Sequence, residues 1–176
     1  MTYATDRAWS ETLVPQVKFL VGPHLLEAAP FDIDQSEATD LIVLRARDMR
    51  IAVRIRRFGY FPRYGSQFTI RCRRESGAKT ELAKIVEGFG DWLFYGHAND
   101  SEDQIEHWML IDLAAFRAAL IRSCMNNNYK VTSGLANNHD GTHFAWFDAR
   151  SFAWCEPPLL IAASQSVLDL LQEPAA

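Results

Sequence analysis

The chain has 176 residues, of which 48% are hydrophobic and 23% charged, proportions typical of one globular domain with a substantial core. No apolar run approaches the roughly 18 residues that a membrane span needs, and the first residues lack the pattern of a secretory signal. Three scattered cysteines, Cys72, Cys124 and Cys155, argue against a disulfide framework and a paired-cysteine zinc site. We therefore expect a single, reduced, cytoplasmic domain that does not enter a membrane.

The net charge of −4 conceals a strong asymmetry along the chain. Residues 45–74 contain ten arginines and one acidic residue, Asp48, so this stretch carries +9 and the remainder −13. All four lysines lie outside it. Because the planar guanidinium forms paired hydrogen bonds with phosphate, this stretch predicts a surface that binds a polyanion. Its arginines are Arg45, Arg47, Arg50, Arg54, Arg56, Arg57, Arg63, Arg71, Arg73 and Arg74.

The first predicted element is a helix over Asp6–Leu26. Apolar residues recur there at helical spacing, and Pro15 and Gly22-Pro23 break the helix into a short lead and a main part. An acidic connector, Phe31–Thr39, follows.

Three strands are expected next, because each segment is rich in β-branched or aromatic residues and alternates with a period of two. In the second strand the alternation places Arg54 and Arg56 on one face. A tight turn at Asp48-Met49 would join the first two strands into a hairpin with Arg45 and Arg47 on that same face. The three strands are Asp40–Arg47, Arg50–Phe58 and Gln67–Arg74.

The remainder of the chain predicts further helices and strands. Thr80 is a candidate N-cap for a helix that ends at Val86 or Glu87, before Gly88. The elements expected after it are strands Asp91–Ala98 and Ile105–Ile111, helix Asp112–Arg122, a hairpin of Tyr129–Thr132 with Thr142–Phe147, and a short helix Gln165–Leu171. The predicted fold class is α/β (α+β), with a mixed central sheet flanked by helices. The core covers about residues 10–122, and a C-terminal hairpin and helix extension covers residues 123–176.

The order helix, strand, strand, strand, helix, strand resembles the αβββαβ core of the PD-(D/E)XK nuclease superfamily. Asp40 opens an apolar strand, as the first acidic position of that superfamily does, and Ile51–Arg57 falls where the superfamily places Glu-x-Lys. The stretch from Gln67 through Ser76-Gly77 to Gly96 resembles phage and restriction-type members. The resemblance implies a nuclease-like, phage or prophage-encoded protein that acts on nucleic acid.

One departure from the superfamily pattern concerns the metal ligands. The Glu-x-Lys position reads Arg54-Ile55-Arg56 here. Metal-dependent phosphodiester hydrolysis requires more than one carboxylate to hold Mg²⁺, and the motif supplies only Asp40. A second ligand would have to come from elsewhere, with Glu27, Glu37 and Glu81 as candidates.

Several residues have both a functional and a structural interpretation. Asp40 is either a catalytic metal ligand or the ion-pair partner of Arg57 on the facing strand. Tyr60, Phe61 and Tyr64 either stack on nucleobases or fold over one another. Lys84 either contacts phosphate, as the resemblance implies, or belongs to a solvated helix face. The arginines either bind a ligand or pair with the acidic residues elsewhere in the chain.

These observations favour a nucleic-acid-binding protein with a nuclease-like fold and a degenerate active site. The expected contacts to DNA or RNA come from Arg45, Arg47, Arg54, Arg56, Arg71, Arg73 and Lys84. Two alternatives stay open. One is an active Mg²⁺-dependent nuclease with a rearranged ligand set. The other is a phage inhibitor or accessory protein whose arginines dock on an acidic protein partner.

Overall fold

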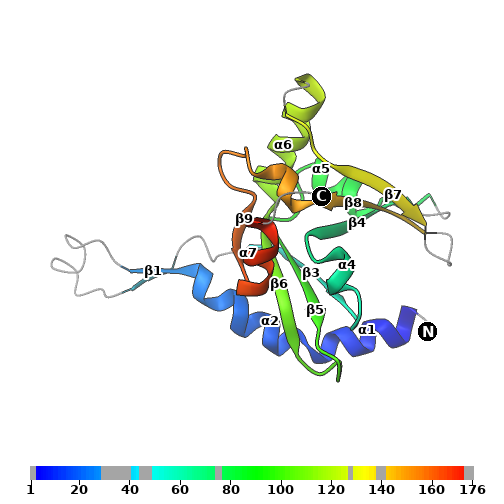
Figure 1. Ribbon diagram of the computed structural model, residues 1–176, viewed down its shortest axis with the longest axis vertical. Coiled ribbons are helices and arrows are strands. Elements are labelled where there is room, and N and C mark those ends of the chain that lie inside the picture. The colour runs from blue at the N-terminus through cyan, green and yellow to red at the C-terminus, as the bar shows by residue number, and fades with distance from the viewer. Residues whose placement is uncertain are drawn as a thin grey trace.

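The computed structural model describes residues 3–28, 41–43, 49–73, 77–126, 129–137 and 142–172. Within these ranges the protein is a mixed α/β fold with six α-helices (Figure 1). A four-stranded mixed sheet has the order β3 (Ile51–Arg56), β5 (Trp92–Ala98), β6 (Ile105–Asp112), β9 (Leu160–Ala163). A three-stranded antiparallel sheet has the order β4 (Gln67–Arg73), β8 (His143–Asp148), β7 (Ser133–Asn137).

The N-terminal helical segment covers one face of the four-stranded sheet (Figure 1). It consists of α1 (Tyr3–Thr12) and α2 (Val14–Val21), followed by the 3₁₀ turn η1 (Gly22–Leu25), so it is broken at Pro15 and Gly22-Pro23 as predicted. Pro15 lies in the first turn of α2, where its missing N–H removes no helical hydrogen bond. The buried side chains of α2 pack against Ile55, Phe94 and Leu110.

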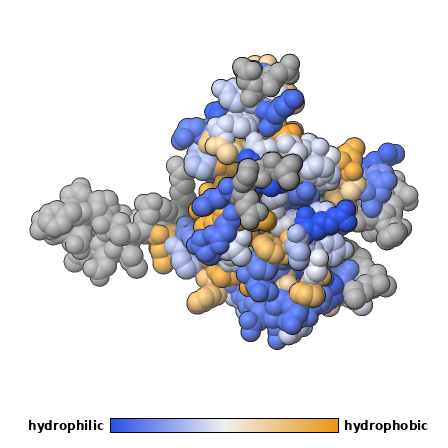
Figure 2. Space-filling model, in the orientation of Figure 1, coloured by the Kyte–Doolittle hydropathy of each residue, from blue (hydrophilic) through white to orange (hydrophobic). Residues whose placement is uncertain are grey.

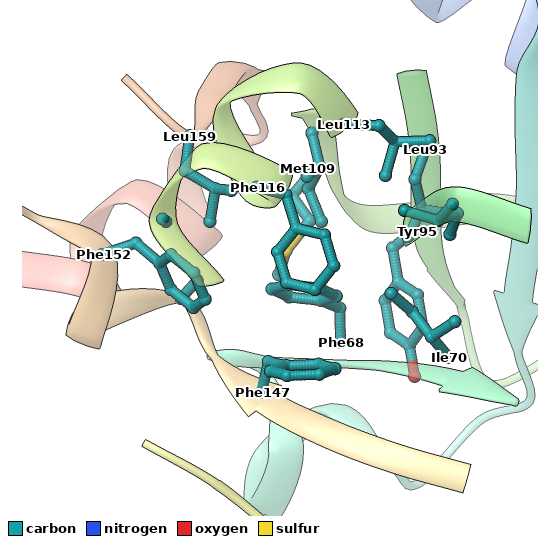
Figure 3. Packing of buried hydrophobic residues seen from close by; sticks show 14 of the residues in the cluster. Phe68, Ile70, Leu93, Tyr95, Met109, Leu113, Phe116, Phe147, Phe152 and Leu159 are labelled. Atoms are coloured by element: carbon teal, nitrogen blue, oxygen red, sulfur yellow. The ribbon is translucent and has the colours of Figure 1, made fainter. Parts of the chain in front are cut away.

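The opposite face of this sheet belongs to the larger core, which also contains α6 (Leu113–Met125) and the three-stranded sheet. Three aromatic side chains meet at its centre (Figure 3). The ring centroid of Phe68 lies 5.5 Å from that of Phe116 and 5.4 Å from that of Phe147. Phe68 and Phe147 come from the three-stranded sheet and Phe116 from α6. Met109 and Ile111 of the four-stranded sheet belong to the same core, so burying this cluster holds the layers together.

Three shorter helices and one 3₁₀ turn complete the fold. The helices are α4 (Phe61–Tyr64), α5 (Glu81–Val86) and α7 (Gln165–Gln172), and the 3₁₀ turn is η2 (Ala149–Phe152). Thr80 caps α5 as predicted, because its hydroxyl accepts a hydrogen bond from the backbone N–H of Ala83 at 3.3 Å. None of the helices in the described ranges is long and apolar enough to cross a membrane. On the face shown in Figure 2, hydrophilic side chains surround smaller hydrophobic areas.

The predicted hairpin between the first two strands is wrong. β2 (Leu41–Val43) pairs antiparallel with β1 (Leu26–Ala28), and β3 pairs in parallel with β5. The pairing that was expected would have set arginines opposite one another across two strands, which is destabilising. β5 instead offers β3 a strand that is buried along almost all of its length. The two strands β1 and β2 project from the body of the molecule (Figure 1).

Two further expectations need correction. The predicted strand Gln67–Arg74 exists as β4, but it belongs to the second sheet, where it pairs with β8. Phe68 and Phe147 are cross-strand neighbours in that pairing, and burying both rings favours it over a place beside β3. The C-terminal hairpin is present, yet its first strand is β7 at residues 133–137 and not Tyr129–Thr132. Tyr129 packs against Trp154 instead, with ring centroids 4.7 Å apart.

Candidate ligand-binding pocket

The two arginines of β3 point between the sheets. As the alternation predicted, Ile55 turns towards α2 while Arg54 and Arg56 share the opposite face. That face meets the three-stranded sheet, because both guanidinium groups donate hydrogen bonds to the hydroxyl of Thr69 on β4. Two side chains that were expected on an open surface therefore lie at the junction of the two layers.

Arg54 is neutralised within the protein. Its Nη2 donates a hydrogen bond to Oε2 of Glu81 at 3.1 Å, and its Nη1 donates to Thr69 Oγ1 at 3.1 Å. The same carboxylate lies 4.0 Å from Nη1 of Arg71 on β4. Burial lowers the pKa of Arg54 from its ordinary value, and the charge of Glu81 opposes that shift. Glu81, considered above as a metal ligand, thus forms ion pairs with two arginines from two different sheets.

Arg56 has a different environment. Its Nε donates a hydrogen bond to the hydroxyl of Tyr95 at 2.8 Å, and its Nη2 donates to Thr69 Oγ1 at 2.6 Å. No ion pair joins it to a carboxylate in the part of the chain that the structure describes. Aromatic rings take the place of a counter-ion. The guanidinium carbon lies 5.6 Å from the centroid of Tyr60, 5.9 Å from that of Tyr95 and 5.6 Å from that of Phe144.

Arg56 lines a pocket of about 370 Å³. This volume lies near the lower end of the range of roughly 300–1,000 Å³ that is typical of small-molecule sites. The walls come from β3, β5, the turn and helix α4, and one face of the three-stranded sheet. They consist of Arg56, Tyr60, Tyr64, Gln67, Thr69, Tyr95, His97, Ala136, Phe144 and Trp146. The lining contains five aromatic side chains besides His97, one permanent cation and no carboxylate.

His97 is a buried polar residue of this lining, with only 1% of its surface exposed. Both of its ring nitrogens lack a hydrogen-bond partner among the described residues. Burial, and then the positive charge of Arg56 and the neighbouring His107, lower the pKa of His97 to about 4. The imidazole is therefore neutral at pH 7, with one nitrogen as donor and the other as acceptor.

Tyr95 joins the hydrophobic core to the pocket. Its ring packs in the core, and its hydroxyl oxygen lies at the edge of the cluster (Figure 3). This oxygen accepts the hydrogen bond from Arg56 and lies 3.2 Å from Thr69 Oγ1. The three groups hold one another, so the guanidinium of Arg56 is fixed on the side of Nε and Nη2.

One wall of the pocket depends on a glycine. Gly134 on β7 lies directly opposite Trp146 on β8. A Cβ atom at position 134 would lie 2.7 Å from the indole of Trp146, closer than two such atoms can approach. Because glycine leaves this space empty, the indole packs flat against the neighbouring strand.

The aromatic residues of the loop before β4 divide between two roles. Tyr60 and Tyr64 line the pocket and are 47% and 38% exposed. Phe61 turns inward, and its ring stacks on that of His107 with centroids 3.6 Å apart. The self-packed interpretation therefore holds for Phe61, and base stacking by Tyr60 and Tyr64 stays a prediction.

The other predicted site residues do not gather at the pocket. Arg57, considered above as an alternative ion-pair partner of Asp40, forms ion pairs with Asp6 and Glu102, so it fixes α1 to the body of the protein. Arg73 is exposed at the end of β4, and Lys84 is exposed on α5. Asp40, Arg45 and Arg47 lie outside the described residues, as does Glu37. Within the described ranges no three His, Cys, Asp or Glu side chains are grouped closely enough to hold a metal ion.

Sequence reasoning missed His97, Phe144 and Trp146 as members of the site. Phe144 and Trp146 share a face of a predicted strand, which was a usable signal. His97 carried no signal, because nothing local indicates that its strand lies beside Arg56. Comparisons with protein-family models, curated proteins and solved structures found no match to this chain.

Proposed function

We propose that the protein binds single-stranded nucleic acid through the pocket around Arg56. The observation that carries this proposal is a guanidinium surrounded by aromatic side chains, with no carboxylate partner among the described residues. Single-strand binders combine positive charge, which follows the phosphates, with aromatic rings on which bases stack. A double helix keeps its bases stacked inside and cannot place one in such a pocket without unpairing it.

A second arginine extends the positive charge to the pocket mouth. Arg63 is exposed on α4, and its guanidinium carbon lies 5.3 Å from the ring centroid of Tyr64, which lines the pocket. A strand whose base enters the pocket would therefore pass a cation as it leaves. This arrangement suits phosphates on either side of the bound base.

The nuclease-like ancestry belongs to the same proposal. In the resemblance drawn from the sequence, Arg54 and Arg56 occupy the position where the PD-(D/E)XK superfamily has Glu-x-Lys. Two guanidinium groups would repel a divalent cation, and Glu81 already pairs with two arginines. We therefore infer binding without cleavage at this position, so adding Mg²⁺ should leave a labelled strand intact.

The proposal is tested by fluorescence anisotropy with a labelled single strand across a salt series. Affinity should fall with salt, with a log–log slope of about −0.7 for each phosphate that the protein neutralises. Arg56→Gln should weaken binding at least tenfold. Arg50→Gln removes the same charge from an arginine that pairs with Asp91, and it should change affinity by less than a factor of about two.

Two results would contradict the proposal. One is an affinity that does not change with salt, and the other is equal binding by the Arg56→Gln and Arg50→Gln variants. An acidic peptide that competes with wild-type binding more strongly than a single strand does would favour the protein-docking alternative. Melting curves of each variant show whether a loss of binding comes from unfolding.

A further inference from the structure

The chemistry of the pocket is more selective than strand binding requires. A surface that tolerates any sequence needs only charge and stacking rings. This pocket also contains a fixed guanidinium and a buried imidazole without partners. Such groups read the edge of a base through hydrogen bonds, and they exclude bases that leave them unpaired.

The guanidinium of Arg56 is oriented and partly free. Tyr95 and Thr69 accept from its Nε and Nη2, while Nη1 makes no hydrogen bond within the described part of the chain. The group can only donate. Guanine presents two adjacent acceptors, O6 and N7, and arginine contacts this pair more often than any other base edge. Adenine presents a donor beside N7, and cytosine presents an amino donor, so both match the guanidinium less well.

The imidazole of His97 provides the second observation. Its nitrogens are buried and unpartnered, which costs about as much free energy as a lost hydrogen bond. Both nitrogens are closed to solvent in this structure, so a base edge reaches them only when side chains of the pocket lining shift on binding. Because the imidazole is neutral, it offers one donor and one acceptor without adding a second positive charge.

We propose that the pocket binds one unpaired guanine base, which stacks between the aromatic side chains while Arg56 and His97 read its edge. This inference rests on the proposed single-strand binding. The pocket volume of about 370 Å³ suits one nucleotide and not several, so a single position of the strand is selected. Guanine in a strand and guanine in a free nucleotide share this chemistry.

The test uses short thymidine strands that differ at one central position, which is guanine, adenine, cytosine or an abasic site. Guanosine monophosphate serves as a competitor. The guanine strand should bind roughly 5- to 150-fold more tightly than the adenine and abasic strands, the range that one paired arginine–guanine contact provides. If guanosine monophosphate displaces the guanine strand, the base itself, and not the strand, is the main determinant of binding.

Two variants separate base reading from charge. Arg56→Lys keeps the charge but loses the planar fork, so the salt dependence should persist while the preference for guanine falls at least fivefold. His97→Phe keeps a ring of similar shape without hydrogen-bonding atoms, and it should also reduce the preference. His97→Gln, which retains a donor and an acceptor, should preserve more of it than His97→Phe does.

The outcomes distinguish this inference from the proposed function. Equal, salt-dependent binding of the guanine and abasic strands would overturn the guanine pocket and leave strand binding intact. If no strand binds but guanosine monophosphate does, and Arg56→Lys weakens it, the pocket reading survives and the proposed function fails. If neither ligand binds to the folded protein, both are wrong.

Discussion

Arg54 and Arg56 are two residues apart on one face of β3, yet their surroundings are opposite. Arg54 donates to Glu81 and is one of two arginines that this carboxylate serves. Arg56 has three aromatic rings within 5.9 Å of its guanidinium carbon and a neutral His97 beside it on β5. The first environment satisfies a cation within the protein. The second leaves the charge of a cation available to a ligand.

The difference shows that counting arginines does not locate a binding site. Ten arginines made residues 45–74 conspicuous, but the charges of Arg50, Arg54 and Arg57 are paired with carboxylates of the protein itself. What distinguishes Arg56 is its neighbours. Four predictions can break or sharpen this comparison.

The largest expected effect concerns His97, a neighbour that Arg56 has and Arg54 lacks. Burial, Arg56 and His107 lower its pKa from 6.5 to about 4 in the folded protein. Between these values the unfolded chain binds more protons than the folded protein does, so stability falls as the pH drops from about 6.5 to 4. The full loss is about 3 kcal/mol, which urea unfolding at a series of pH values measures.

The control for this prediction is His97→Phe, measured at the same pH values. All other titrating groups are shared, so the difference between the two proteins isolates His97. The variant should lose less stability than the wild type between pH 6.5 and 4. Parallel pH profiles would mean that the imidazole is not kept neutral by its surroundings.

The next effect comes from the wall of the pocket. In Gly134→Ala the added methyl group would lie 2.7 Å from the indole of Trp146, so the ring or the strand has to move. We expect a loss of about 2 kcal/mol in the free energy of unfolding, together with weaker strand binding. Gly22→Ala, where nothing lies within 4 Å of the added atom, is the matched control and should leave binding unchanged. If Gly134→Ala leaves the affinity for the strand unaltered, Trp146 is not part of the ligand site.

Removing the counter-ion of Arg54 should affect stability more than binding. In Glu81→Gln, Arg54 and Arg71 lose a shared carboxylate that is 43% exposed, so the expected destabilisation is about 1–2 kcal/mol after allowance for solvent screening. Affinity for a single strand should rise slightly, because one negative charge leaves the area. The reverse pattern, a stable variant that no longer binds, would place Glu81 in the binding site and undo the contrast with Arg56.

The smallest effect is expected from Arg63→Ala. This arginine is exposed beside Tyr64, which lines the pocket, and in the proposed complex it would contribute a phosphate contact and a cation–π contact, each worth about 1 kcal/mol or less at such a site. Stability should not change measurably, while the slope of affinity against salt should become shallower by about 0.7. An unchanged slope would show that the strand leaves the pocket on another side.

Local patterns predicted much of the fold. The period-two alternation correctly placed Arg54 and Arg56 together, opposite Ile55. Thr80 was recognised as a cap because a cap is a local interaction, and the breaks at Pro15 and Gly22-Pro23 are local too. What failed was strand pairing. β3 pairs with β5 across a separation of about 40 residues, and no local signal favours that partner over a nearer strand.

The site was predicted only in part for the same reason. Tyr60 and Tyr64 were candidates because they share one short aromatic segment with Arg63. Phe144 and Trp146 reach the pocket only because β8 pairs with β4, and His97 only because β5 pairs with β3. The nuclease resemblance directed attention to Asp40, which lies outside the described residues, so its role as a metal ligand stays a prediction.

The cluster of Arg54, Glu81 and Arg71 has an uneven stoichiometry: two cations share one anion. Arg54 belongs to one sheet, Arg71 to the other, and Arg56 adds a further positive charge at the same junction. Among the described residues, positive charge therefore exceeds negative charge at the seam between the layers. An anionic ligand would supply the missing charge, so binding should draw the two sheets together and slow amide exchange in β3 and β4 alike.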